Sequence, residues 1–278
     1  MGHNDEKEFA KLASRIKIPL RPRVLTELKA LFSGDNYDAR AVSKIINKDP
    51  VLVAMLFKTV RSPVFGCGES TDSLEQVLMI IGVKKIYNLV QALSLSGSVS
   101  NKSRDAFELF WTRSQDVAQL SAIIAADHIN TCKILPDDAY MTGMFHQCGI
   151  PVIRLSFLDY CAQMQSENLS DWPDIAQEDA KFNVDHCEIG YRVGRHWNLP
   201  DFVCAAIGHY REIPNDDLGK AKNLISILQT GIQFHSRIKN IPNPLWVKVG
   251  ANALDDLGVP PDDELEYFEA VAERFKGA

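Results

Sequence analysis

Apolar residues recur at helical spacing through this chain of 278 residues, and stretches that alternate in the manner of a strand are scarce. Between Arg23 and Phe32, for example, apolar residues occupy positions i, i+1, i+4, i+7 and i+8, which lie on one face of an α-helix. Helices of this kind bury their apolar faces against one another. The pattern therefore predicts an all-α protein built as a helical bundle.

Two strong helix starts locate the most apolar elements. Asp49 can accept hydrogen bonds from free amides at a helix N-terminus, and Pro50 is tolerated in the first turn. The helix that follows is apolar around most of its circumference, so we expect it to lie centrally. The run Ser73-Leu74-Glu75-Gln76 is a capping box, and Gly82 separates its helix from another over Val83–Leu95.

The polar stretch Ser96–Asp105 is the best candidate for a linker. It divides the chain into an N-terminal helical lobe, residues 1–98, and a C-terminal helical lobe, residues 104–278. The predicted fold is therefore a two-lobed, all-α bundle. Start and stop signals predict further helices at Ala106–Ile129, Asp137–Gln147, Pro151–Ser166, Asp185–Trp197, Asp201–Tyr210, Asp217–Arg237 and Pro261–Lys276.

Charge and hydropathy exclude two classes of partner. The formal net charge is −6, whereas a protein that binds phosphate backbones through a basic surface normally carries the opposite sign, so we expect no nucleic-acid partner. The longest apolar run, Val51–Phe57, is far shorter than the roughly 18–20 residues needed to cross a bilayer. The start of the chain is polar and acidic, unlike a signal peptide. We therefore expect a cytoplasmic protein that does not bind membranes.

The six cysteines are scattered, with no CxxC pair of the kind that a structural zinc site would use. A chain of this length can bury a sizeable core without disulfides. We expect reduced and mostly buried thiols at Cys67, Cys132, Cys148, Cys161, Cys187 and Cys204.

Several familiar catalytic motifs are absent: the chain has no P-loop, no complete dinucleotide-binding glycine motif, no GxSxG and no HExxH. A cysteine nucleophile could be imagined from Cys148 or Cys187 beside His146 or His186. Proximity in sequence says little about geometry in the fold, however, so buried structural cysteines are the preferred interpretation.

Histidines on predicted helices are the more informative cluster. His146, His186 and His209 all fall in the C-terminal lobe. If they converge, three imidazoles could bind a divalent transition metal. The simpler interpretation is that each is a half-buried histidine that donates one hydrogen bond, and spacing alone favours it.

An ordered series of motifs carries a resemblance to a known family. The segments are Lys48–Leu52, Arg61–Gly66, Ile80–Val90, Phe110–Ser114, His186–Gly190, Trp197–Pro200 and Ala206–Tyr210. In that order they resemble the QDP-x-L, NS-x-x-FG, LLGLRRLRNLV, LWRHS, HAEVG, WNLP and AIRHHH patterns of HDOD domains, which are relatives of the HD phosphohydrolases. The resemblance extends from about Ile18 to His235, which leaves a C-terminal helical extension. It implies that the C-terminal lobe is a degenerate HD-like bundle.

The resemblance also implies a set of positions for metal ligands. HD phosphohydrolases hold one or two divalent metals through a histidine, an adjacent His-Asp pair and a later aspartate, and the metal generates hydroxide and polarises a phosphoryl oxygen. Carried over to this chain, these positions fall near Arg113, on His146-Gln147, and near Leu228-Gln229-Thr230. Three of the four ligands are thus replaced. Arg113 cannot lose its proton and would repel a cation, so we expect no metal, no cofactor and no catalysis.

What remains is the expectation of a bacterial signalling or regulatory module that acts through protein contacts with a separate, unidentified signalling polypeptide. We expect a vestigial polar pocket, which holds the fold or binds a small ligand, formed by Arg113, His146, Gln147, His186 and His209. The alternative is a metal-dependent phosphohydrolase of HD type with an atypical ligand set, which would recruit Asp185 or Asp138.

Two helical features have competing interpretations. The helices on either side of Gly82 have the length of a helix-turn-helix, with Lys84, Lys85, Tyr87, Asn88 and Gln91 on the helix that would read DNA. The apolar share of that helix and the acidic charge of the chain favour a pair packed inside the bundle instead. On the helix of His186, Gly190 and Gly194 indicate close packing of another helix, which favours a hydrogen-bonding core role for His186.

Overall fold

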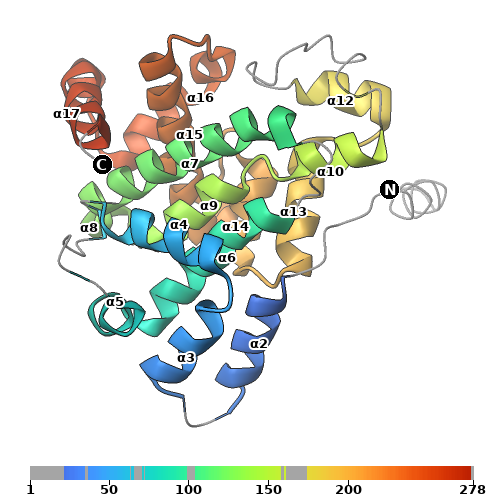
Figure 1. Ribbon diagram of the computed structural model, residues 1–278. Coiled ribbons are helices and arrows are strands. Elements are labelled where there is room, and N and C mark those ends of the chain that lie inside the picture. Colours follow the sequence, from blue (N-terminus) through green and yellow to red (C-terminus); the bar gives the residue numbers. More distant parts are fainter. Residues whose placement is uncertain are drawn as a thin grey trace.

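The computed structural model describes residues 22–34, 37–62, 64–65, 71, 73–98, 104–157, 160 and 174–276. Over these residues the secondary structure is helical, with no strand, so the all-α prediction is confirmed. Figure 1 shows the arrangement. The α-helices are α2 (Arg23–Phe32), α3 (Ala39–Ile46), α4 (Pro50–Val60), α5 (Leu74–Ile81), α6 (Val83–Ser98), α7 (Arg104–Asp127), α8 (Ile129–Cys132), α9 (Pro136–Phe145), α10 (Gly149–Ser156), α12 (Ile175–Phe182), α13 (His186–His196), α14 (Asp201–His209), α15 (Lys220–Lys239), α16 (Pro244–Leu257) and α17 (Glu264–Lys276).

The predicted helix starts in the N-terminal half are confirmed. The carboxylate of Asp49 accepts a hydrogen bond from the amide of Leu52 at 3.0 Å, at the start of α4. The hydroxyl of Ser73 accepts one from the amide of Gln76 at 3.2 Å, at the start of α5. Gly82 has φ of +93°, a conformation that favours glycine, and it turns the chain between α5 and α6.

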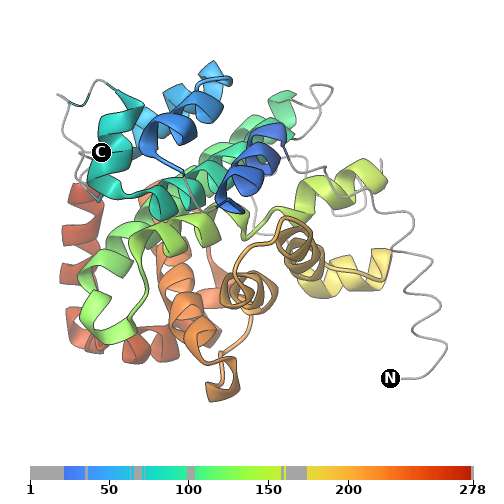
Figure 2. The same cartoon turned by 90° about the horizontal axis from the view of Figure 1, so that it is seen from below.

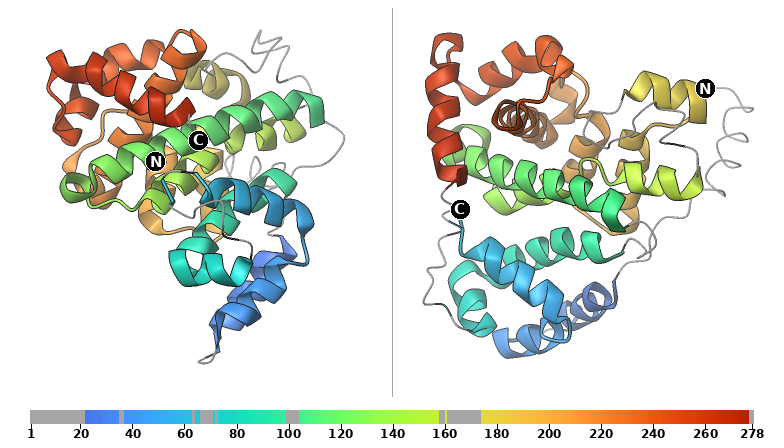
Figure 3. Two further views of the ribbon diagram at one scale, coloured as in Figure 1. Left: turned by 60° about the vertical axis from the view of Figure 1, so that its left-hand side comes forward. Right: turned by 45° about the horizontal axis from the view of Figure 1, so that its top comes forward.

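The long helix α7 runs between the helices of the N-terminal half and those of the C-terminal end, as both views of Figure 3 show. It packs against α9 and α15, and α9 packs in turn against α6. Buried apolar residues from α2 to α17 belong to one contiguous core. The candidate linker, part of which lies outside the described residues, therefore does not separate two independent cores.

Polar contacts cross the same junction. The amide of Asn88 on α6 donates to the carboxylate of Asp137 on α9 at 2.8 Å, and both side chains are buried. Gln91 donates to the carbonyl oxygen of Trp197 at 3.4 Å. Asn88 and Gln91 of the face that would read DNA are thus buried, whereas Lys84 and Lys85 at the start of α6 are exposed. Helix α6 packs against α5 and α9, as the interpretation of a packed helix pair predicts. Figure 2 shows α6 among its neighbours from below.

The close packing predicted on the glycine face of α13 is confirmed. A Cβ added to Gly190 would lie 2.8 Å from the side chain of Ile207, and one added to Gly194 would lie 3.1 Å from the sulfur of Cys204. Both neighbours belong to α14. The glycines therefore let α13 and α14 approach, which fixes the position of His186 at the start of α13.

Four helices escaped the sequence analysis: α3, α8, α12 and α16. Of these, α8 has only four residues. Two are only eight residues long, and short helices depend on tertiary contacts more than on their own signals. Of the expected helix Pro151–Ser166, α10 covers the first part and begins earlier, at Gly149, whereas residues 158–159 and 161–166 lie outside the described residues.

Among the described residues, no single helix is both long enough and apolar enough to cross a membrane. Helix α5 and the first part of α6 meet both criteria only as a pair, and the pair is bent by 116°.

Candidate functional site

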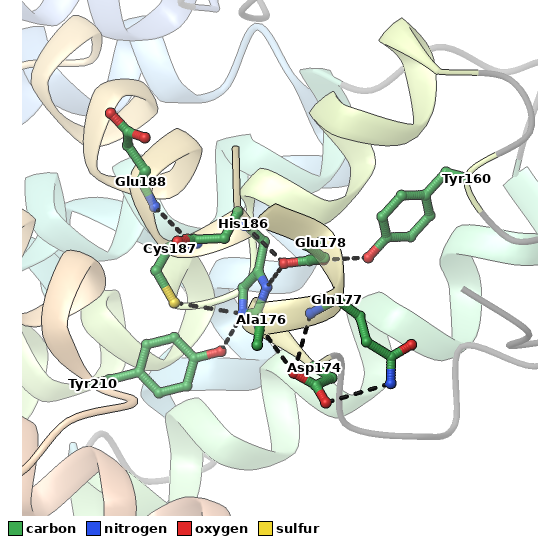
Figure 4. Close-up of polar contacts among 10 residues, drawn as sticks. Tyr160, Asp174, Ala176, Gln177, Glu178, His186, Cys187, Glu188 and Tyr210 are labelled. Carbon is green, nitrogen blue, oxygen red and sulfur yellow. Dashed lines mark hydrogen bonds and ion pairs between the residues drawn. The ribbon is translucent and has the colours of Figure 1, made fainter. Parts of the chain in front are cut away.

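A chain of buried polar side chains runs through the C-terminal half of the protein (Figure 4). One ring nitrogen of His186, Nδ1, lies 2.6 Å from Oε2 of Glu178, and the other, Nε2, lies 2.6 Å from the hydroxyl of Tyr210. The backbone amide of His186 donates to the same oxygen of Glu178 at 3.0 Å. The hydroxyl of Tyr160 donates to Oε1 of Glu178. His186 and Glu178 are both fully buried.

Three helices position these buried polar side chains. Asp174 caps α12, which carries Glu178, by accepting the amide hydrogens of Ala176 and Gln177. His186 is the first residue of α13, and Tyr210 directly follows α14. Because Glu178 also binds the backbone of His186, the short helix α12 is fastened to the start of α13.

His186 and Glu178 form an ion pair. Burial alone would raise the pKa of Glu178, but the charge of His186 and the hydrogen bonds it receives lower that pKa. Burial alone would lower the pKa of His186, but Cys187, Glu178 and Tyr210 raise it well above 6.5. Imidazolium and carboxylate are therefore the stable forms at neutral pH. Both ring N–H groups then donate, one to Glu178 and one to Tyr210.

His146, at the end of α9, is in the opposite state. Its Nδ1 lies 2.6 Å from the carbonyl oxygen of Gly143, so Nδ1 carries the hydrogen and donates it. Burial lowers the pKa of His146 to about 3, and the positive charges of His186, Arg113 and His235 act in the same direction. The ring of Tyr210 packs against both histidines, with its centroid 5.4 Å from that of His146 and 5.9 Å from that of His186.

Arg113 and Gln147 complete the group that the sequence analysis selected. Arg113, on α7, is only 5% exposed, and its charge acts on His146. Gln147 is fully buried, and neither polar atom of its amide has a hydrogen-bond partner among the described residues. Arg113 and His186 thus both lie close enough to His146 for their charges to act on it, and Gln147 follows His146 in the chain.

The prediction is wrong for His209. Its side chain is about half exposed and lies 3.4 Å from Glu212 on the surface. Residues 201–209 form a helix whose buried face carries other side chains, namely Val203, Cys204, Ala206 and Ile207. The residue that does reach the site is the next one, Tyr210. Spacing along a helix places residues on a face, but only packing decides which face turns inward.

The cysteines are free thiols where the structure describes them. Cys132, Cys148, Cys187 and Cys204 are buried, as expected, whereas Cys67 and Cys161 lie outside the described residues. The sulfur of Cys187 is 3.6 Å from Nε2 of His186. That nitrogen already bonds Tyr210, and Cys187 is 4% exposed, so the pair is not an accessible nucleophile and base.

The residues at the HD ligand positions do not fit a divalent metal. Arg113 offers no lone pair and carries a positive charge. The amide nitrogen of Gln229 donates to the carbonyl oxygens of Tyr210 and Glu212, at 2.8 and 2.7 Å. Both ring nitrogens of His186 are hydrogen-bonded within the chain. Over the described ranges, no group of three or more histidines, cysteines or acids is arranged to hold a metal ion.

The acids that the alternative interpretation would recruit are occupied elsewhere. Asp185 caps α13 and accepts the amide hydrogens of Cys187 and Glu188. Asp138 lies in the first turn of α9, near Asn88 and Lys220. It stands eight residues before His146, or about 12 Å along a helix, so it cannot share a metal with that ring.

Sequence analysis missed Glu178, Tyr160 and Tyr210. One signal was available: in the AIRHHH pattern that Ala206–Tyr210 resembles, a histidine stands where this chain has Tyr210. Nothing local marks Glu178, because a glutamate on a short polar helix is normally solvated. Its partner His186 is eight residues away, beyond the reach of any helical pairing rule.

Comparisons with known proteins agree on the fold. A crystal structure from Shewanella amazonensis, named "Putative phosphohydrolase", has a TM-score of 0.68 at 19% identity, covering 96% of this chain and 94% of its own. An HDOD domain protein from Geobacter sulfurreducens has a TM-score of 0.65 at 16% identity, covering 98% and 95%. A "Putative signal transduction protein" from Marinobacter aquaeolei has a TM-score of 0.69 at 18% identity, covering 98% and 63%.

Sequence comparisons identify the family. A protein of Treponema pallidum is 24% identical over 213 residues, which are 75% of this chain and 40% of that relative. The chain therefore spans less than half the length of this curated relative. The family model described as HDOD domain matches residues 18–213, well over half of the chain. By that match the chain belongs to the HDOD domain family.

Proposed function

We propose that this chain is a non-catalytic bacterial regulatory protein that acts through contacts with a separate signalling protein. The observation that carries the proposal is the chemistry at the HD ligand positions, where Arg113, Gln147 and Gln229 stand in place of a histidine and two acids. A buried guanidinium supplies a fixed positive charge where the phosphohydrolases place a metal cation. Hydrolysis of a phosphate ester would lack both the metal and the acids that hold it.

The remaining polar groups support a structural role for the site. His186 uses its two ring nitrogens and its backbone amide to join α12, α13 and the end of α14. His146 is held neutral against the carbonyl oxygen of Gly143. These buried hydrogen bonds tie the helices together and give a rigid body for a partner to recognise.

Surface residues on α5 offer a way to test the contact. Met79 and Ile80 are adjacent, and they are 72% and 60% exposed. A charge at each position should weaken a contact made by this face without disturbing the core. Val247, on α16, is 93% exposed, and Figure 1 shows α16 at the top of the molecule, far from α5 at the lower left, so Val247→Lys is a matched control.

The experiment is crosslinking capture in the native cell by the wild-type chain, by the Met79→Lys/Ile80→Lys variant and by Val247→Lys. A partner that is retained by Val247→Lys and lost from the α5 variant supports the proposal. Equal recovery by all three chains, or no specific partner, counts against it.

The second candidate is a metal-dependent phosphohydrolase, favoured by the name of the Shewanella structure and by the one imidazole, His146, that keeps an HD ligand position. Its test is turnover of nucleotides and cyclic dinucleotides with added Mn²⁺, together with metal analysis of protein purified without chelator. We expect no turnover and no stoichiometric metal. Hydrolysis that is lost in His146→Ala would decide for the enzyme.

A further inference from the structure

A cavity of about 220 Å³ lies at the junction of the two halves, and no residue of the buried histidine site lines it. Its walls come from α4, α6, α7 and α9, and Figure 3 shows α4 beneath α7 at this junction. The lining residues are Met55, Lys58, Thr59, Ser62, Leu93, Gln115, Asp116, Gln119 and Tyr140.

The cavity carries a net positive charge, because its one carboxylate is paired with cationic groups outside the lining and its lysine is not paired with a carboxylate of the described residues. Asp116 lies 3.1 Å from the ammonium of Lys239 and 3.6 Å from the ring of His235, both on α15, so its negative charge is already matched. Lys58 stands exposed at the end of α4, and no carboxylate of the described residues lies within ion-pair distance of it. An anion is therefore the ligand that the cavity would attract.

Neutral hydrogen-bonding groups surround that charge. Gln115 and Gln119 are four residues apart on α7, so their amides share one face of the helix. The hydroxyl of Thr59 donates its hydrogen to the carbonyl oxygen of Met55 at 3.0 Å. In the 3.3 Å contact between the hydroxyls of Thr59 and Tyr140, Tyr140 is therefore the donor. The Tyr140 hydroxyl can redirect that hydrogen to a ligand without breaking a backbone contact.

Size and apolar surface narrow the class of ligand. Pockets for drug-sized molecules measure roughly 300–1,000 Å³, so this smaller cavity suits a molecule below that range. Met55 and Leu93 contribute apolar surface that a carbon skeleton can cover and that an inorganic ion would leave unused.

We propose that the junction cavity binds a compact organic carboxylate, with its negative charge on Lys58 and its short carbon body against Met55 and Leu93. Such a ligand would bridge α4 of the N-terminal half and α7 of the C-terminal half. This site stands independently of the proposed protein contacts, because it requires neither a partner nor the α5 surface.

Calorimetric titration of the full chain with pyruvate, succinate and glutarate tests the proposal. We expect saturable binding of at least one of these, one molecule per chain, and none of the neutral analogue succinamide. Lys58→Met should weaken binding by at least about tenfold, because it removes the charged hydrogen bond. Lys58→Arg, which keeps the positive charge, should retain most of the wild-type affinity. Lys44→Met, which changes an exposed lysine on α3, should leave binding unchanged.

Three results would overturn the proposal: no saturable binding of any of the three carboxylates, equal binding by Lys58→Met and the wild type, or binding of inorganic phosphate alone. Because Lys58 is exposed, loss of folding does not complicate the comparison, and a thermal melt of each variant checks that point.

Discussion

At the scale of single residues, two buried histidines that pack against the same tyrosine ring differ in charge: His186 is positive and His146 is neutral. His186 has a buried carboxylate at hydrogen-bond distance, and the attraction outweighs the cost of burying its charge. His146 donates to the backbone carbonyl of Gly143, and its burial and the nearby positive groups keep it neutral. The residue type is the same, and the neighbours decide the charge.

His146 should make the protein sensitive to acid. Its pKa is about 3 in the folded protein, whereas an unfolded histidine titrates near 6.5. Below pH 6.5 the ring of His146 binds a proton in the unfolded chain but not in the folded protein. The free energy of unfolding therefore falls as the pH drops from about 6.5 toward 3. This one residue contributes up to ~1.4 kcal/mol for each pH unit in that window. Urea unfolding at a series of pH values measures the slope.

The control for this measurement is a second histidine. His146→Gln should flatten the slope between pH 6.5 and 4.5, while the exposed His209→Gln should leave it as in the wild type. An unchanged slope in His146→Gln would show that the ring is not buried in its neutral form.

The ion pair of His186 should be costly to break. Glu178→Gln removes the charge and leaves a buried imidazolium without its counter-ion, which typically destabilises a protein by about 3–5 kcal/mol. Glu188→Gln is the matched change in a half-exposed surface pair with Arg192, and it should cost below about 1 kcal/mol. Denaturant unfolding of both variants compares them. Equal losses would mean that the buried pair is not ionised.

At the scale of elements, the fold depends on close approaches between helix ends. The first residue of α10, Gly149, lies against the first residue of α13, because a Cβ at this position would be 2.1 Å from the carbonyl oxygen of His186. The backbone of His186 cannot move aside in the way that the end of a flexible side chain can. The absence of a side chain at Gly149 is therefore what lets α10 lie across the start of α13.

Gly149→Ala should destabilise the protein by about 2 kcal/mol or more, because it forces α10 and α13 apart. Gly208→Ala is the control: it also lies in a helix, but its added Cβ would be 3.5 Å from Tyr191, an ordinary contact. Alanine has the higher helix propensity, so Gly208→Ala should be neutral or slightly stabilising. Thermal unfolding of both variants tests this, and similar melting temperatures would contradict the packing argument.

At the scale of the whole molecule, the two halves share one core. The buried contact between Asn88 and Asp137 and the packing of α6 on α9 join the segments that the candidate linker would divide. We expect a single unfolding transition, with the same midpoint by far-UV circular dichroism and by tryptophan fluorescence. Two separated transitions, or a fragment of residues 104–278 that folds alone with native helicity, would contradict this expectation.

The sequence allowed much of this architecture to be predicted. The caps at Asp49 and Ser73, the turn at Gly82 and the glycine face of α13 are local signals, and the structure contains each of them. Arg113, His146 and His186, which the sequence singled out, are all buried, and the charges of Arg113 and His186 act on His146. Glu178 and Tyr210 could not be assigned, because their roles arise from contacts between helices that are distant in the chain.

Local chemistry by itself determined most of the helical segments and where most of them begin. These properties depend on neighbours within a few positions. Only the tertiary structure decided that Tyr210, and not His209, faces inward, that His186 is paired with Glu178, and that α6 closes onto α9. The physical reason is that burial and side-chain pairing depend on which helix faces pack against each other. Sequence spacing shows which residues share a helix face, but it does not show which other helix packs on that face.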